Sequence, residues 1–124
     1  MPKTLITTSF VDEIPVLTVS TDDTHRKPVI VHIPGYGGNK EHGIPFGYFE
    51  AQMGFLWISF DPLYHGERYN PILDRAFEPE FGGLYPPESG LDIGRVFYQV
   101  IHHCLEDVMR ILDHFSKDPY ADVQ

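Results

Sequence analysis

The chain lacks the features that define several large protein classes. Its single cysteine, Cys104, excludes an internal disulfide framework and fits a reducing compartment. The chain has 9 Lys and Arg against 18 Asp and Glu, and the net charge of −9 argues against nucleic acid or an anionic membrane surface as a partner. No apolar run approaches the roughly 18 residues that span a bilayer, and the first ten residues contain no apolar signal-peptide segment. These absences predict a cytoplasmic protein.

The residues that are present fit one folded domain that covers residues 1–124. Hydrophobic residues make up 42% of the chain and aromatic residues 14%, which is typical of a globular protein with its own core. Four segments rich in apolar or β-branched residues predict strands. They are Thr4–Phe10, Ile14–Ser20, Val29–Ile33 and Phe55–Phe60. The first two form a predicted antiparallel hairpin, and the last two are expected to be buried.

Two helices are predicted between and after these strands. In the segment Ile44–Met53, Phe46, Phe49 and Met53 recur at helical spacing, and Gly54 ends the helix. Strand, helix and strand within about thirty residues predict a βαβ unit. An irregular connection is expected over Tyr69–Gly90, and residues 120–124 are expected to form a short exit.

The second helix, Leu91–Phe115, carries apolar residues every three or four positions. These are Ile93, Val96, Phe97, Val100, Ile101, Cys104, Leu105, Val108, Leu112 and Phe115. The stripe predicts one long amphipathic helix in which Cys104 is a small buried hydrophobe.

A glycine-rich corner follows the central predicted strand: Pro34-Gly35-Tyr36-Gly37-Gly38. Glycines allow a tight turn that brings backbone N–H groups close to a ligand, which suits an anion or an oxyanion. From this spacing alone, an ordinary turn between strand and helix is equally compatible. Neither the spacing of a dinucleotide-binding loop nor a Walker motif is present, which argues against nucleotide binding.

A second motif, Asp61-Pro62-Leu63-Tyr64-His65-Gly66-Glu67-Arg68, leaves the next predicted strand. With Pro34–Glu41, it resembles the α/β-hydrolase superfamily, more narrowly the dienelactone-hydrolase-like and prolyl-oligopeptidase-like esterases. The resemblance implies an α/β fold, with a mixed, mostly parallel sheet and flanking helices. It covers the front half of that fold, with strand order 1-2-4-3 and an open edge where a nucleophile strand would pair with Val29–Ile33.

The resemblance also implies a chemistry, the hydrolysis of a carboxylic ester or related acyl substrate through a serine acyl-enzyme without a cofactor. By position, the backbone N–H of Tyr36, after Gly35, corresponds to an oxyanion-hole donor. Gly37, Tyr64 and His65 correspond to substrate-binding positions. A small acyl or ester molecule would be the partner of the intact protein.

Two departures from the family qualify this implication. Pro34 replaces the histidine of the family's His-Gly pair. No G-x-S-x-G is present, so none of the catalytic triad lies in the chain, and its members are expected beyond Gln124. We therefore expect an N-terminal fragment of a serine hydrolase that is inactive alone. The alternative is a non-catalytic half-domain that binds a partner chain, or a second copy, through its open sheet edge.

Polar residues outside the glycine corner have simpler interpretations. His65 is expected to be a hydrogen-bonded turn residue, and Asp61 a structural carboxylate at the end of a strand. On the long helix, the pairs His102 with Glu106 and His103 with Asp107 have metal-ligand spacing. Without an H-E-x-x-H pattern, we interpret them as polar residues of the outer helix face and predict no metal.

Overall fold

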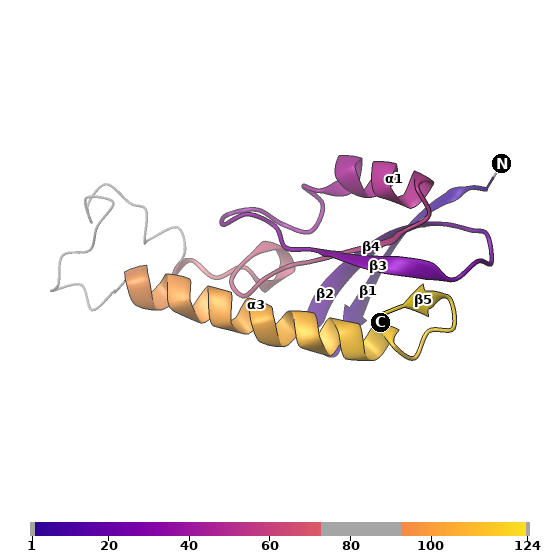
Figure 1. Cartoon of the computed structure of the whole chain (residues 1–124). Coiled ribbons are helices and arrows are strands. Elements are labelled where there is room, and N and C mark those ends of the chain that lie inside the picture. The colour runs from indigo at the N-terminus through magenta and orange to yellow at the C-terminus, as the bar shows by residue number, and fades with distance from the viewer. Residues whose placement is uncertain (1, 73–92, 124) are drawn as a thin grey trace, which may run out of the picture.

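A mixed sheet of five strands with a helix on each face makes up the described part of the chain, residues 2–72 and 93–123 of the computed structural model (Figure 1). The elements are β1 (Thr4–Val11), β2 (Ile14–Thr21), β3 (Lys27–His32), α1 (Ile44–Gln52), β4 (Leu56–Phe60), the 3-10 helix η1 (Gly66–Arg68), α3 (Ile93–Phe115) and β5 (Ala121–Asp122). In space the strands run β1-β2-β4-β3-β5. The α/β class and the predicted order of the first four strands are confirmed.

The sheet combines an antiparallel hairpin with a parallel unit. β1 pairs antiparallel with β2 through a two-residue turn at Asp12 and Glu13, and β2 pairs antiparallel with β4. Asp12 adopts a φ of 53°, the left-handed value that tight hairpin turns require. β3 pairs parallel with β4, as expected for the two strands that flank α1. The predicted hairpin and βαβ unit are therefore both present.

Apolar residues fill both sides of the sheet. Every residue of β4 is buried, as the sequence predicted. Leu56, Ile58 and Phe60 belong to the cluster that packs against α3. Trp57 points to the opposite face and packs with Ala51 of α1, because successive side chains of a strand alternate between faces.

The helix α1 does not pack through the large apolar residues whose spacing predicted it. Phe46, Phe49 and Met53 are 67%, 72% and 68% exposed, and the buried positions of the helix are Gly47 and Ala51. A Cβ atom added at Gly47 would lie 2.5 Å from the Trp57 ring. The indole fills the space between the sheet and the helix, so only the helix face that carries Gly47 and Ala51 can pack against the ring.

The long helix α3 is confirmed over Ile93–Phe115, but its predicted apolar stripe is too wide. Val96, Val100 and Cys104 are buried as predicted, whereas Ile101 and Leu105 are 62% and 61% exposed. One face of a helix can contact the sheet, and the residues about a quarter-turn away from it extend beyond the strands beneath. Residues 73–92, which hold most of the predicted connection and the predicted helix start, lie outside the described residues.

The prediction that the central strand is buried is wrong for β3. Its residues from Val29 to His32 are half-buried, and Ile33 follows the strand and is 48% exposed. The reason is its place near the sheet edge, where β5 pairs only with Lys27 and Pro28. Residues 120–124 were expected to be an exit, and the structure instead has the short strand β5 there. None of the helices in the described ranges combines the length and apolarity that crossing a membrane requires.

Candidate functional site

The two sequence motifs meet at the carboxyl ends of β3 and β4. These strands are parallel neighbours, so the loop after His32 and the loop after Phe60 emerge at the same edge of the sheet. The first loop leads to α1 on one face, and the second leads towards α3 on the other face (Figure 1). A crevice forms where neighbouring connections diverge in this way, and open α/β sheets commonly bind ligands there.

The glycine corner is a type II turn over Gly35–Gly38. The N–H of Gly38 donates to the carbonyl of Gly35 over 2.8 Å, and Gly37 has a φ of +85°. A type II turn needs a positive φ at its third residue, which explains a glycine at that place. Tyr36 is the second residue of the turn, and its ring packs edge-on against Phe97 of α3 at 4.3 Å.

His65 joins this turn to the second loop. The N–H of Gly37 donates to Nε2 of His65, and Nδ1–H of His65 donates to the carbonyl of Leu63, each over 2.8 Å. A carbonyl can only accept, so the hydrogen-bond pattern requires the neutral ring with its proton on Nδ1. The imidazole is buried, and both of its nitrogens bind the backbone, as the interpretation of His65 as a turn residue predicts.

Asp61 holds the base of both loops. Its carboxylate is fully buried and accepts from the N–H of Lys40 at 2.9 Å, the Nζ of Lys40 at 2.9 Å and the N–H of Glu67 at 3.0 Å. Gly66, with a φ of +53°, passes so close that a Cβ there would overlap this carboxylate. Asp61 is thus a structural carboxylate at a strand end, as predicted.

Lys40 is the buried cation of the site. Its Nζ also contacts Glu67 at 2.6 Å and Glu41 at 2.9 Å. Burial acts to lower the pKa of Lys40, but hydrogen bonds to Glu67, Asp61 and Glu41 outweigh it and raise the pKa, so the side chain stays charged.

A second ion pair connects the site to α3. Arg68 donates to the carboxylate of Asp107 at 2.6 Å and to the carbonyl of Asp61 at 3.1 Å. Asp107 is fully buried, so its predicted place on the outer face of the helix is wrong. The charged residues of both ion pairs were visible in the sequence, but their pairing was not, because the partners are 21 and 39 residues apart.

An apolar cavity of about 250 Å³ lies beside the turn. It is lined by Ile33, Pro34, Tyr36, Pro62, His65, Phe97, Val100, Ile101 and Cys104. Of the residues predicted for the site, Tyr36 and His65 line this cavity, and Gly35 and Gly37 belong to the turn at its rim. Tyr64 instead packs against the core cluster on the α3 side of the sheet. The sequence did not predict that Ile33, Pro62 and Phe97 would line the cavity.

No serine among the described residues lines this cavity. Ser59 is fully buried in the middle of the sheet, where it pairs with Leu17 and His32. Cys104 does line the cavity, but burial and the nearby charge of Asp107 raise the pKa of its thiol. A raised thiol pKa opposes thiolate formation, so Cys104 is not an activated nucleophile. Among the described residues, this cavity is therefore an apolar wall without a serine or an activated thiol.

The predicted metal-spacing pairs do not form a metal centre. His102 and Glu106 contact each other at 3.2 Å on the exposed side of α3. Within residues 2–72 and 93–123, no three His, Cys, Asp or Glu side chains gather closely enough to hold a metal ion.

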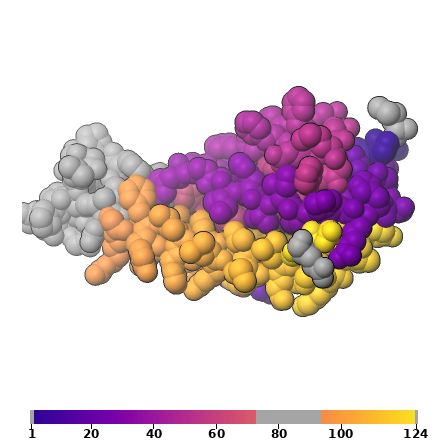
Figure 2. Space-filling model, viewed as in Figure 1, coloured from indigo at the N-terminus to yellow at the C-terminus, as the bar shows by residue number. Residues whose placement is uncertain are grey.

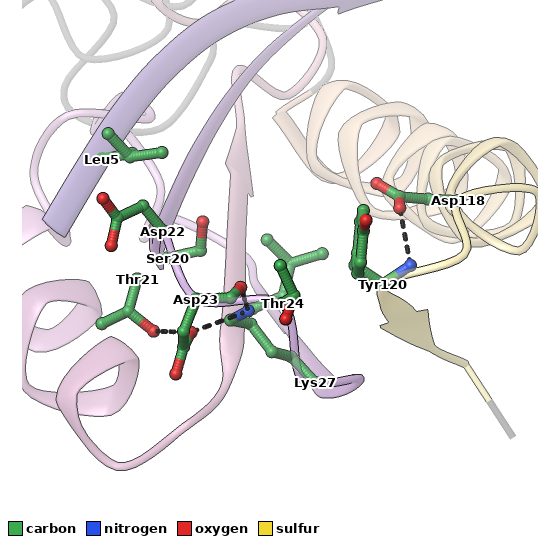
Figure 3. A pocket seen from close by; sticks show the side chains of 10 residues that line it. Leu5, Ser20, Thr21, Asp22, Asp23, Thr24, Lys27, Asp118 and Tyr120 are labelled. Atoms are coloured by element: carbon green, nitrogen blue, oxygen red, sulfur yellow. Dashed lines mark hydrogen bonds and ion pairs between the residues drawn. The ribbon is translucent and has the colours of Figure 1, made fainter. Parts of the chain in front are cut away.

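A larger, more polar cavity of about 390 Å³ lies at the opposite end of the sheet (Figure 3). The buried Lys27 lies at its wall, and its Nζ contacts the carbonyls of Asp23 and His25 and the carboxylate of Asp23 at 2.8 to 3.1 Å. These three acceptors satisfy the three N–H donors of the ammonium group, so the charge of Lys27 serves to hold the turn together. Neither sequence motif reaches this end.

Comparison with known proteins gives one distant similarity. The chain is 26% identical to "Putative esterase YitV" of Bacillus subtilis (strain 168) over 114 residues, which cover 90% of this chain and 38% of that protein. The chain thus spans well under half the length of this relative. No family model matches the chain, and no solved structure matches it. The fold places the protein in the α/β class, and the similarity points to a hydrolase.

Proposed function

We propose that this chain is the N-terminal part of a serine hydrolase that acts on carboxylic esters or related acyl substrates. The observation that carries the proposal is the position of the Tyr36 turn. It lies at the carboxyl end of β3, beside an apolar cavity that Tyr36 helps to line and that residues of both loops border. The similarity to a protein named as an esterase supports the same class of activity.

In this proposal the protein has the α/β-hydrolase fold, and the chain forms one side of its active site. The backbone N–H of Tyr36 donates to the oxyanion, and the apolar cavity holds the acyl or alcohol group of the substrate. The serine, its acid and its histidine come from polypeptide that follows Gln124. Asp61 and Lys40 hold the loops rigid, and a preorganised donor is worth more than one that must move during the reaction.

The sharpest test removes one donor and changes little else. Proline is favoured at the second position of a type II turn and has no N–H, so Tyr36→Pro deletes the proposed donor in a turn that accepts it. Tyr36→Ala is the matched control, because it also removes the ring but keeps the N–H. In the polypeptide extended by its downstream reading frame, we expect Tyr36→Pro to lower kcat about 100-fold or more relative to Tyr36→Ala, with KM little changed.

A fluorophosphonate probe tests the division of the site between the two segments. The extended polypeptide is expected to be labelled on serine, whereas the purified 124-residue chain is expected to remain unlabelled. Labelling of the short chain would contradict the claim that it lacks the nucleophile. A reading frame without a downstream G-x-S-x-G would refute the serine hydrolase itself.

The open edge of β3 favours a second candidate, a non-catalytic module that binds another copy of the chain. β5 leaves the edge from Val29 to His32 uncovered by any described strand. Arg110 binds the β1–β2 turn from one flank of α3, so the exposed Ile101 and Leu105 on the other flank face away from β1. Figure 2 shows β3 and its loop, in violet, lying along α3, in orange to yellow.

Such a corner would accept an added strand, with backbone bonds to β3 and apolar contacts to α3. We expect sedimentation to show a dimer that Ile101→Glu with Leu105→Glu disrupts. Gln99→Glu, on the polar flank of the same helix, is the control and is expected to leave the dimer intact. A wild-type chain that stays monomeric at high micromolar concentration would eliminate this candidate.

A further inference from the structure

His65 contacts the proposed oxyanion turn in two ways. It accepts the Gly37 N–H through Nε2, and its ring lies edge-on to that of Tyr36 at 5.3 Å and 85°. From these contacts we propose that His65 is the positioning residue of the turn, the group that holds its central peptide in one orientation and thereby keeps the conformation of the turn that carries the Tyr36 N–H. This rests on the proposed function, because it takes the Tyr36 N–H as the oxyanion donor.

The geometry of the turn explains why one hydrogen bond from Gly37 to His65 is enough to hold its central peptide. The N–H of Gly37 belongs to the peptide group between Tyr36 and Gly37, which is the central peptide of the turn. This peptide can flip in turns of this kind, because a glycine at the third position tolerates several backbone conformations. Anchoring its N–H on His65 holds the plane of this peptide and so fixes ψ of Tyr36 and φ of Gly37. The Tyr36 N–H lies on the preceding peptide of the same turn, whose carbonyl, that of Gly35, accepts the Gly38 N–H.

The imidazole is itself well held. Nδ1–H donates to the carbonyl of Leu63 in the second loop, and only 3% of the residue is exposed. That loop is fixed in turn by Asp61, which accepts the N–H of Glu67. Rotation of the ring would break the bond to Leu63 or the bond to Gly37. The carboxylate at the base of the loops is therefore connected to the turn through a side chain with one allowed orientation.

His65 acts here through an acceptor lone pair, and both of its ring nitrogens are engaged by the backbone. It needs no proton transfer and no contact with the substrate. This separates it from a general base, whose free nitrogen would have to reach the reacting group.

Two near-isosteric substitutions separate the two hydrogen bonds. His65→Gln places an oxygen near the position of Nε2 and can still accept from Gly37. His65→Asn places its amide near the position of Nδ1, so it can donate to Leu63 but cannot reach Gly37. Amide hydrogen exchange by NMR on the 124-residue chain then reports the state of the turn without any activity.

We expect the Gly37 amide to exchange on the order of tenfold faster in His65→Asn than in the wild type, and within about threefold of the wild type in His65→Gln. The wild type should also show a scalar coupling across the hydrogen bond between the amide nitrogen of Gly37 and Nε2 of His65. The indole signal of Trp57, on the other face of the sheet, reports whether each variant remains folded.

Equal exchange of Gly37 in the Asn and Gln variants would overturn the inference, as would the absence of the coupling in the wild type, which needs no variant. These outcomes are independent of ester hydrolysis. A downstream frame without a reactive serine would refute the proposed enzyme and leave the NMR result unchanged. If the Gly37 amide exchanged equally fast in the Asn and Gln variants, the positioning role of His65 would be refuted even if the enzyme were an active esterase.

Discussion

At the scale of single residues, the site depends on a buried carboxylate surrounded by donors. Asp61 receives two backbone N–H groups and one ammonium group, so its charge is compensated in place. Breaking a buried pair of this kind is costly because it leaves an uncompensated charge. The close passage of Gly66 is part of the same arrangement, since any side chain there would displace the carboxylate.

We therefore expect Gly66→Ala to lower the free energy of unfolding by about 2 kcal/mol or more, through overlap with Asp61 and the positive φ of residue 66. Urea unfolding measures the change. Gly35→Ala is the matched control, because a Cβ at Gly35 has nothing within 4 Å. The two variants should differ clearly, and equal stabilities would show that the Gly66 backbone can move away from Asp61.

At the scale of elements, α1 shows how one large side chain can decide which way a helix faces. The indole of Trp57 fills the space between the sheet and the helix, and Gly47 rests on it. Phe46 and Phe49 of the helix, and Met53 just after it, consequently face solvent. The apolar spacing was correctly interpreted as helical, but it did not identify the face that packs.

For Gly47→Ala two effects compete. Alanine gains about 1 kcal/mol of helix propensity over glycine, whereas overpacking a well-filled contact costs about 1–3 kcal/mol. With the new Cβ at 2.5 Å from the ring, we expect overpacking to win and the variant to be destabilised by about 1–2 kcal/mol in urea unfolding.

The control for this prediction is Phe49→Ala, which should change the stability by less than about 0.5 kcal/mol because the side chain is exposed. A loss of the several kcal/mol that is typical of a buried phenylalanine would show that α1 packs through its aromatic face instead.

A second link between elements is ionic. Arg110 of α3 donates to both oxygens of Glu13 at 2.7 and 2.6 Å and to Asp12 at 2.9 Å. The hydrogen bond from Arg110 lowers the pKa of Glu13 to about 2. The folded pKa lies below the unfolded value, so the stabilisation is present above pH 4.5 and is lost as the pH falls towards 2.

Arg110→Gln should accordingly lower Tm by a few degrees at pH 6, and the difference from the wild type should shrink as the pH falls from 4.5 to 2. Melting curves across this range measure it. Lys117→Gln breaks a more exposed contact with Asp113 at 3.9 Å and should have a smaller effect at every pH. A constant difference for Arg110→Gln would mean that its effect does not come from the charge of Glu13.

At the scale of the whole molecule, residues 120–122 return to the sheet next to β3. The N–H of Lys27 donates to the carbonyl of Tyr120 over 2.8 Å, and Ala121 is buried in the core cluster. This contact joins residues almost a hundred positions apart and closes the layer of α3 over the sheet.

Removing the chain from Tyr120 onwards should lower the free energy of unfolding by about 1–3 kcal/mol, because a buried side chain and the pairing of β5 are lost. Tyr120→Ala is the control and should have little effect, because its carbonyl remains and its ring is half exposed. Hydrogen exchange at Lys27 gives the local measurement. An unchanged rate in the shortened chain would show that β5 does not protect β3.

The sequence by itself determined the α/β class, the hairpin, the βαβ unit, the long helix and the positions of both loops. These follow from local patterns, because residue spacing sets the secondary structure and glycines set the turns. Tertiary structure alone decided the packing face of α1, the burial of Asp107, the half-exposed state of β3 and the pairing of Lys40 with Asp61. Each of these depends on which surfaces meet across distant parts of the chain, and no local pattern records that. The same reason explains His65, whose place in a turn was predictable, whereas its hydrogen bond to Gly37 appeared only once both loops lay at one edge of the sheet.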